Sequence, residues 1–301
     1  MNELRGKLLQ RYGFRQFHSS DRMLLDTYEQ GSVFFDLSFT NFWAWEKTFR
    51  YVYRIVGDTF VVAYTGLDKT AYCTLLPGER RDLRDAVILV RDIFQQEGLP
   101  FVFEYIPEQW LELYRAAGLP MEVSSDRDWS DYIYLMSEFV DITGAGNKSK
   151  RRALSLFAKQ GNADFQPLSL DNFDTAVEVF RRWCVWHDCR DCVFGCERRA
   201  FERLKEIWDK RYYGGVVCLD GEPVAFALAE TLGDCACYSF QKNAGHIPGL
   251  TYFLHYHCAQ LPGHPPRMNW CEDMGLEGLR ANKLRFHPCA IVEKYTIQLN
   301  A

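Results

Sequence analysis

The 301-residue sequence contains no long uninterrupted apolar segment. A membrane-spanning helix needs about 20 mostly apolar residues, and the hydrophobic runs of this chain are broken well before that length. The first residues, MNELRGKLLQRYGF, also lack the apolar core that a secretory signal peptide carries. We therefore expect a cytoplasmic protein without a transmembrane segment.

The sequence also lacks an excess of positive charge. It has 35 Lys and Arg residues against 40 Asp and Glu residues, and its formal net charge is -5. A protein coated in charge for nucleic-acid binding is excluded, and only local basic patches remain open. The clearest patch is KSKRR at Lys148–Arg152, which begins a predicted helix. Its cations Lys148, Arg151 and Arg152 are candidates for binding phosphate, although such a run also suits a solvated helix face.

The sequence lacks the paired knuckles of a zinc site. Eleven cysteines are present, and we expect them to be reduced thiols without disulfides. In CVWHDCRDCVFGC only Cys189 and Cys192 have a CxxC spacing, and no second CxxC lies downstream. Cys184 falls on the apolar face of a predicted helix, as a small packed side chain does. We therefore predict no metal site.

Length and composition favour two ordinary domains. Hydrophobic residues make up 48% of the chain and aromatic residues 15%, which is enough for two sizeable cores. Both halves show the same order of elements: three strands, a helix, a strand and a helix, followed by two strands in the first half and one final strand in the second. The first half reads as strands 50–57, 59–65 and 71–76, helix 80–96, strand 101–106, helix 108–117, and strands 121–124 and 131–139. The second reads as strands 216–219, 223–231 and 235–241, helix 248–259, strand 267–270, helix 277–286 and strand 290–299, preceded by helices 172–187 and 197–210.

The repeated order predicts an α/β (α+β) fold with a mixed central sheet in each domain. Helices 80–96 and 248–259 each connect two strands, and such crossovers imply at least one parallel strand pair in each sheet. We place the domains at residues 1–143 and 144–301.

The segment NWCEDMGLEGLRANKLRFHP gathers candidate site residues at one strand-to-helix turn. Glu272 and Asp273 end the strand. A helix start rich in glycine presents unpaired backbone N–H groups, which suit a phosphate or carboxylate. The candidate ligand-binding residues of this helix are Gly275, Gly278, Arg280 and Lys283. The alternative is structural: the two carboxylates cap the helix and pair with Arg280 or Lys283.

A second strand-to-helix loop, KNAGHIPGL, contains Lys242, Gly245 and Gly249. Its helix start is suited to an anion, and Lys242 can neutralise a phosphate or carboxylate there. The two glycines lie four residues apart, and this does not match the Gln/Arg-x-x-Gly-x-Gly/Ala segment that cradles coenzyme A in N-acyltransferases. The alternative for Lys242 is a solvated lysine at a strand end.

The order of elements is that of the acyl-CoA N-acyltransferase (GNAT) fold, and WLELYRAAGL resembles a segment of that superfamily. More specifically, YSFQKNAGHIPGLTYFLHYHCA, NWCEDMGLEGLRANKLRFHP and IVEKYTI resemble the phosphatidylglycerol lysyltransferase C-terminal domain family. That family carries two GNAT-like folds in tandem and is similar to Fem-type aminoacyltransferases. The resemblance implies transfer of an aminoacyl group from tRNA, a donor that the KSKRR patch suits.

Two functions follow from these observations. The first is an acyl or aminoacyl transferase that uses aminoacyl-tRNA or acyl-CoA as donor substrate, has no covalently bound cofactor, and acts on an amine or hydroxyl acceptor. Glu272 or Asp273 would then act as the base, and Lys242 would stabilise the oxyanion. The second is a non-catalytic tandem GNAT-like module that binds an anionic ligand or a protein partner.

Overall fold

The computed structural model describes residues 2–28, 32–66, 70–144, 147–188 and 195–299. Over these residues the chain forms two compact units. Unit 1 contains residues 1–131, 272–280 and 291–301, and unit 2 contains residues 132–271 and 281–290. Each unit is built on one mixed sheet of seven strands, which confirms the predicted α/β class with mixed central sheets.

The sheet of unit 1 has the strand order β1-β2-β3-β4-β5-β14-β6. Its strands are β1 (Arg15–Gln16), β2 (Val52–Val56), β3 (Thr59–Thr65), β4 (Ala71–Pro77), β5 (Phe101–Ile106), β6 (Met121–Ser125) and β14 (Tyr295–Leu299). Its helices are α1 (Asn2–Arg11), α2 (Arg22–Leu25), α3 (Phe39–Phe49), α4 (Arg84–Gln96) and α5 (Leu111–Arg115), with 3-10 turns η1 (Ser19–Asp21), η2 (Phe35–Leu37), η3 (Glu108–Trp110) and η4 (Arg127–Trp129).

The sheet of unit 2 has the strand order β13-β7-β12-β11-β10-β9-β8. Its strands are β7 (Asp131–Leu135), β8 (Ala163–Pro167), β9 (Tyr212–Leu219), β10 (Glu222–Leu232), β11 (Cys235–Asn243), β12 (Arg267–Asn269) and β13 (Ala290–Val292). Its helices are α6 (Ser137–Val140), α7 (Lys148–Ala158), α8 (Phe173–Trp186), α9 (Glu197–Glu202), the 3-10 helix η6 (Arg203–Ile207) and α10 (Leu250–Ala259). Helix α11 (Glu277–Arg285) contains the boundary between residues 280 and 281.

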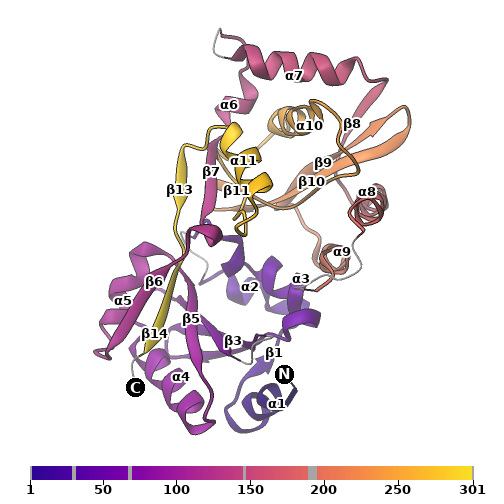
Figure 1. Ribbon diagram of the computed structural model, residues 1–301. Helices are drawn as coiled ribbons and strands as arrows, with labels where there is room; N and C mark the ends of the chain where they lie inside the picture. The colour runs from indigo at the N-terminus through magenta and orange to yellow at the C-terminus, as the bar shows by residue number, and fades with distance from the viewer. Residues whose placement is uncertain (1, 29–31, 67–69, 145–146, 189–194, 300–301) are drawn as a thin grey trace. The chain divides into compact units, whose positions relative to one another are not determined.

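The two units are not the two contiguous halves that the sequence predicted, because each sheet includes a strand from the other half of the chain. Strand β14, at the end of the sequence, lies between β5 and β6 in the sheet of unit 1, where Figure 1 draws it in yellow among purple strands. Strand β7 pairs with β12 in the sheet of unit 2. The predicted boundary between residues 143 and 144 therefore falls inside unit 2. Alternation of apolar residues identifies a strand and its buried face, but it does not identify the neighbouring strand.

Each sheet contains the predicted parallel pair, and each pair separates after three residues. In unit 1, β4 pairs with β5 from Ala71↔Phe101 to Cys73↔Phe103. In unit 2, β11 pairs with β12 from Cys235↔Arg267 to Cys237↔Asn269, while β11 continues to Asn243. The residues that follow these pairs, including Glu104 in unit 1 and Trp270 in unit 2, thus leave the hydrogen-bond ladder of the parallel pair.

A bulge in β11 divides its side chains between the two faces of the unit 2 sheet. Ala229 lies opposite Tyr238 and Leu228 lies opposite Phe240, so the register skips Ser239. Tyr238 packs beside His255 of α10, with ring centroids 5.1 Å apart, and Phe240 packs against Phe201 of α9. Because of the bulge, Tyr238 and Phe240 lie on opposite faces of the sheet, and each packs in the core on its own side.

Candidate functional site

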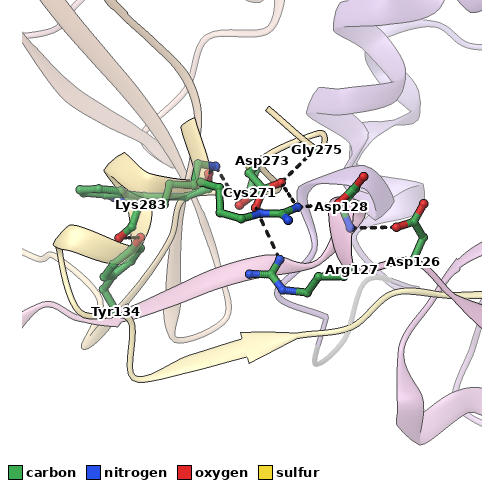
Figure 2. Close-up of polar contacts among 10 residues, drawn as sticks. Asp126, Arg127, Asp128, Tyr134, Cys271, Asp273, Gly275 and Lys283 are labelled. Carbon is green, nitrogen blue, oxygen red and sulfur yellow. Dashed lines mark hydrogen bonds and ion pairs between the residues drawn. The ribbon is translucent and has the colours of Figure 1, made fainter. Parts of the chain in front are cut away.

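The turn that follows β12 is organised by the carboxylate of Asp273, which is fully buried. Arg280 binds it in a bidentate manner: its Nε donates to Oδ2 at 2.9 Å and its Nη2 to Oδ1 at 2.8 Å. Arg127 Nη1 lies 3.5 Å from Oδ2, and the Gly275 N–H donates to Oδ1 at 2.9 Å. Figure 2 shows Asp273 with two of these partners, Arg127 and Gly275. Four donors thus occupy both oxygens of Asp273.

Asp128 is the second carboxylate of this turn. It accepts a hydrogen bond from Arg280 Nη2 at 2.5 Å, and its carbonyl accepts one from the Met274 N–H at 2.9 Å. Hydrogen bonds to Asp273 first and then to Asp128 raise the pKa of Arg280 above its ordinary value. Gly275 has a φ of 71°, and a Cβ added there would lie 2.5 Å from Asp128 Oδ2. Glycine suits this position for two reasons: the backbone is left-handed there, and Asp128 leaves no room for a Cβ.

The backbone donors expected to hold an anion at this turn have partners within it. The N–H groups of Met274, Gly275 and Leu276 donate to the Asp128 carbonyl, to Asp273 Oδ1 and to the Asp273 carbonyl. Asp273 and Arg280 therefore have the geometry of the structural alternative, helix capping and ion pairing. Gly278 has no atom within 4 Å of an added Cβ, so a side chain could be placed there without a clash.

Lys283, the other cation expected at the turn, is buried in unit 2. Its Nζ donates to the carbonyls of Trp270 and Cys271 at 2.5 and 2.9 Å and lies 5.4 Å from the ring centre of Tyr132. Tyr134 donates its hydroxyl to the Lys283 carbonyl at 2.9 Å, as Figure 2 shows. Lys283 therefore satisfies carbonyl groups that follow β12, where the parallel pairing has ended.

Glu272 belongs to a second group of charges in unit 1, which we call the Lys294 cluster: Lys294, Asp36, Asp131 and Glu272. Lys294 Nζ lies 2.5 Å from Asp36 Oδ2, 2.8 Å from Asp131 Oδ1 and 3.0 Å from Glu272 Oε2. Side-chain exposure is 3% for Lys294 and 0% for Asp131, but 16% for Asp36 and 21% for Glu272. The cluster is thus buried on the side of Asp131 and reaches solvent through Asp36 and Glu272.

Burial shapes the protonation of this region. It raises the pKa of Asp36 above the ordinary value, and the charge of Glu272 adds to the effect while Lys294 opposes it. On β5, burial raises the pKa of Glu104 to about 8; the charge of Asp36 adds to this, and a hydrogen bond with Tyr64 and the charge of Lys294 oppose it. Perturbed carboxyl groups of this kind are typical of functional sites.

The Lys294 cluster is also the one group of potential metal ligands found among the residues that the structure describes. Oxygens of Asp36, Asp131 and Glu272 lie within 4.8 Å of one another. Lys294 Nζ lies within 3.0 Å of all three carboxylates, so an ammonium group occupies the position that a metal ion would take. The side chains present therefore fit a nitrogen cation.

The candidate residues of the KNAGHIPGL loop have structural partners in unit 2. Lys242 Nζ lies 2.7 Å from Glu197 Oε1 and 4.7 Å from the ring centre of Trp183. Gly249 begins α10 with a φ of 83°, and an added Cβ would lie 2.0 Å from the Ala153 carbonyl oxygen of α7. Its glycine thus lets α10 approach α7 closely. Gly245 has no atom within 4 Å of an added Cβ.

The cations of KSKRR differ in whether the protein itself supplies their partners. Lys150 is buried and its Nζ lies 2.9 Å from Glu138 Oε2. Arg151 donates to the carbonyls of Ile142 and Gly144 at 2.6 and 2.7 Å. Lys148 and Arg152 are exposed on α7. These last two cations are available to an external anion.

The cysteine-rich segment is described only in part. Cys184 and Cys196 are half-buried. Cys189 and Cys192 lie outside the described residues, so the predicted absence of a metal there stays a prediction.

The fold places the chain in the mixed α/β class, with two mixed sheets that each contain one crossover-linked parallel pair. A conserved protein of unknown function from Bacteroides thetaiotaomicron has 23% identity and a TM-score of 0.84, over 95% of this chain and 99% of that one. The C-terminal domain of a protein named as a lysylphosphatidylglycerol synthetase, from Agrobacterium fabrum, has 17% identity and a TM-score of 0.67, over 94% and 92%. FemX has 10% identity and a TM-score of 0.61, over 95% and 97%.

The family model described as phosphatidylglycerol lysyltransferase, C-terminal, matches residues 33–298. The chain belongs to this family, as the sequence motifs predicted. No curated protein gives a significant match. In the part of the chain that the structure describes, no helix is both long and apolar enough to cross a bilayer.

Sequence reasoning missed four residues of this region: Asp36, Glu104, Asp131 and Lys294. Asp36 and Lys294 are 258 positions apart, so spacing alone does not connect them. The only available signal was the IVEKYTI segment, which contains Lys294 and carried part of the family resemblance.

Proposed function

We propose that this chain is an acyl or aminoacyl transferase that moves an activated group to an amine or hydroxyl acceptor. Membership of the lysyltransferase family over residues 33–298 is the observation that carries this proposal. The Lys294 cluster supports it, because it combines a buried cation with carboxylates that reach solvent. Acyl transfer needs a group that takes a proton from the nucleophile and a group that stabilises the oxyanion.

In this mechanism Glu272 is the base, because it is the most exposed carboxylate of the cluster. The acceptor nitrogen or oxygen forms a bond to the carbonyl carbon of the donor, and its proton passes to Glu272. The tetrahedral intermediate then expels the donor's hydroxyl or thiol, which takes the proton back. Asp273 is less suited to this role, since four donors already occupy its oxygens.

Aminoacyl-tRNA is the donor that we favour over acyl-CoA. Lys148 and Arg152 are exposed on α7 and suit a polyanion. The KNAGHIPGL loop instead uses Gly249 for contact with Ala153 and does not have the glycine spacing of a coenzyme A cradle.

The test is donor consumption. The protein is incubated with charged tRNA or with acetyl-CoA, each with a mixture of amine and hydroxyl acceptors, and loss of the ester or thioester is measured. We expect the tRNA ester to be consumed by the wild type, and Glu272→Gln to lower the turnover much more than donor binding. An unchanged rate in folded Glu272→Gln would exclude Glu272 as the base.

The second candidate function is a non-catalytic module that binds an anionic ligand or a protein. It is favoured because Lys242 and Asp273, which were both expected to act in catalysis, instead bind other side chains of the protein. Binding of a donor without any loss of its activated bond, in every acceptor mixture, would favour this module over the transferase.

A further inference from the structure

Unit 1 contains a small hollow where helix α1 packs against strands β2 and β3, which we call the α1 hollow. It measures about 220 Å³ and opens to solvent. Its apolar lining comes from Leu8 of α1, Phe49 at the end of α3, Val52 of β2 and Ala63 of β3. The residues that line it, as far as the structure describes them, include none of the Lys294 cluster. The hollow is therefore separate from the candidate site described above.

Two arginines bring positive charge to the α1 hollow. Arg5 of α1 and Arg50, the residue after α3, both line it, and no Asp or Glu does so among the described residues. Arg5 Nη2 donates to Glu46 Oε1 at 3.3 Å, but the Arg5 Nε is buried and has no hydrogen-bond partner. Because a buried guanidinium N–H normally has an acceptor, an acceptor from outside the protein would satisfy this one.

Arg50 is held in a backbone conformation that favours glycine. Its φ of 55° and ψ of 44° lie in the left-handed region, where glycine is the usual residue at the end of a helix. Its side chain is exposed and forms no ion pair with any residue that the structure describes. A cation at this end of α3 also interacts favourably with the helix dipole, which is the structural alternative for Arg50. That alternative does not account for Arg5, whose Nε has no partner at the same hollow.

We propose that the α1 hollow binds a small organic anion. Its carboxylate or phosphate group contacts Arg5 and Arg50, because guanidinium groups bind both kinds of oxygen anion through paired N–H bonds. Its apolar part, about the size of one ring, packs against Phe49 and Val52, since small-molecule sites combine an apolar lining with a few charged groups. The inference goes beyond the proposed function, because it uses none of the residues assigned to transfer.

The test is a ligand-observed NMR titration of the full chain at constant ionic strength, with benzoate, phenyl phosphate and the neutral benzamide as probes. We expect at least one anion to bind the wild type roughly tenfold more tightly than benzamide, and the tighter anion identifies the preferred group. Arg50→Gly should weaken binding of that anion by roughly ten- to hundredfold, the effect of losing one charge-assisted hydrogen bond. Because glycine suits the left-handed backbone, the same variant should keep or raise the Tm.

Arg81→Gly is the matched control. Arg81 is another exposed arginine of unit 1 at positive φ, 51°, and it does not line the α1 hollow. It should bind the probes as the wild type does. A second variant, Arg5→Lys, keeps a positive charge beside Glu46 but removes the unpartnered Nε–H, so it should also bind the anion more weakly.

Two results would overturn the proposal. One is equal binding of benzamide and both anions by the wild type. The other is wild-type affinity for the anion in a folded Arg50→Gly or Arg5→Lys variant, which would leave the helix dipole and the pair with Glu46 as the roles of these arginines. If neither variant folds, the comparison of the anions with benzamide in the wild type decides.

Discussion

Glu272 and Asp273 are neighbours in the sequence, yet their carboxylates bind different cations. Glu272 Oε2 lies 3.0 Å from Lys294 Nζ, and Asp273 forms the bidentate pair with Arg280. Glu272 keeps 21% exposure, whereas Asp273 has none. These adjacent carboxylates therefore differ in their surroundings: Asp273 fixes the turn, and Glu272 keeps part of its side chain exposed to solvent.

Replacing Asp273 should destabilise unit 1 strongly. Asp273→Ala leaves Arg280 and Arg127 without their buried partner and removes the acceptor of the Gly275 N–H. We expect a loss of roughly 1.5–3 kcal/mol or more in the free energy of unfolding, measured by urea denaturation, because several charge-assisted hydrogen bonds disappear together. The matched control is Asp234→Ala, whose pair with Arg267 is exposed. Its loss should stay below about 1 kcal/mol, and equal losses in the two variants would contradict this explanation.

The four candidate glycines should separate into two pairs. Gly249→Ala and Gly275→Ala introduce a Cβ at positive φ and within 2.5 Å of another atom, so both should lower the Tm. Gly245→Ala and Gly278→Ala meet no atom within 4 Å and should leave the Tm unchanged or raise it slightly. Thermal melts of the four single variants test this. A loss of donor binding in Gly278→Ala at unchanged Tm would instead indicate that its backbone contacts a ligand.

Glu104 should make the stability of the protein fall as the pH rises. Its folded pKa of about 8 exceeds its ordinary value of 4.5, so the folded state keeps a proton that the unfolded state loses. The stabilisation by this proton is complete below pH 4.5, decreases between pH 4.5 and 8, and is absent above pH 8. Relative to Glu104→Gln, wild-type stability should decline by at most about 1.4 kcal/mol per pH unit in that window. Denaturation curves at several pH values measure this. If the stability of the wild type and that of Glu104→Gln change with pH in the same way, this role of Glu104 is excluded.

Binding of tRNA should depend on Lys148 and Arg152, which are exposed, and not directly on Lys150, which is buried against Glu138. The double variant Lys148→Ala/Arg152→Ala should bind tRNA more weakly, and its slope of log affinity against log salt should be smaller by roughly 1.5–2, as expected for two lost phosphate contacts. Filter binding at several salt concentrations measures this slope. An unchanged slope would remove α7 from the tRNA surface. Arg115→Ala, an exposed cation of α5, is the control.

Local sequence signals predicted most of the elements. Strand β5 begins and ends where expected, at Phe101 and Ile106, because Pro100 and Pro107 flank an apolar run. The crossover helices and their parallel pairs were also predictable, since α4 and α10 have the length and apolar content of buried connectors. Helix α3 (Phe39–Phe49) was missed: its aromatic residues have low helix propensity, and packing in the core stabilises it.

The site was less predictable than the fold. The sequence placed Glu272 and Asp273 at one strand end, but their partners come from distant positions. Lys294 lies 22 residues from Glu272 and 258 from Asp36, and only tertiary structure brings them together. The spacing of Arg280 from Asp273 is local, and for this pair the sequence offered both interpretations, ligand binding and ion pairing.

The place of β14 between β5 and β6 bears on how the protein folds during synthesis. Strands β5 and β6, which flank β14 in the sheet, are synthesised long before it. They pair with β14 and not with each other, so they can join one sheet only after residues 295–299 have left the ribosome. Until then both strands present open edges, which is the condition in which partly folded chains associate with one another. Tyr295 of β14 pairs with Ile106 and Ser125, which lie far back in the sequence, so forming this part of the sheet carries a larger loop-closure entropy cost than pairing strands that are neighbours in the sequence. Chaperone demand should therefore last until β14 has been synthesised.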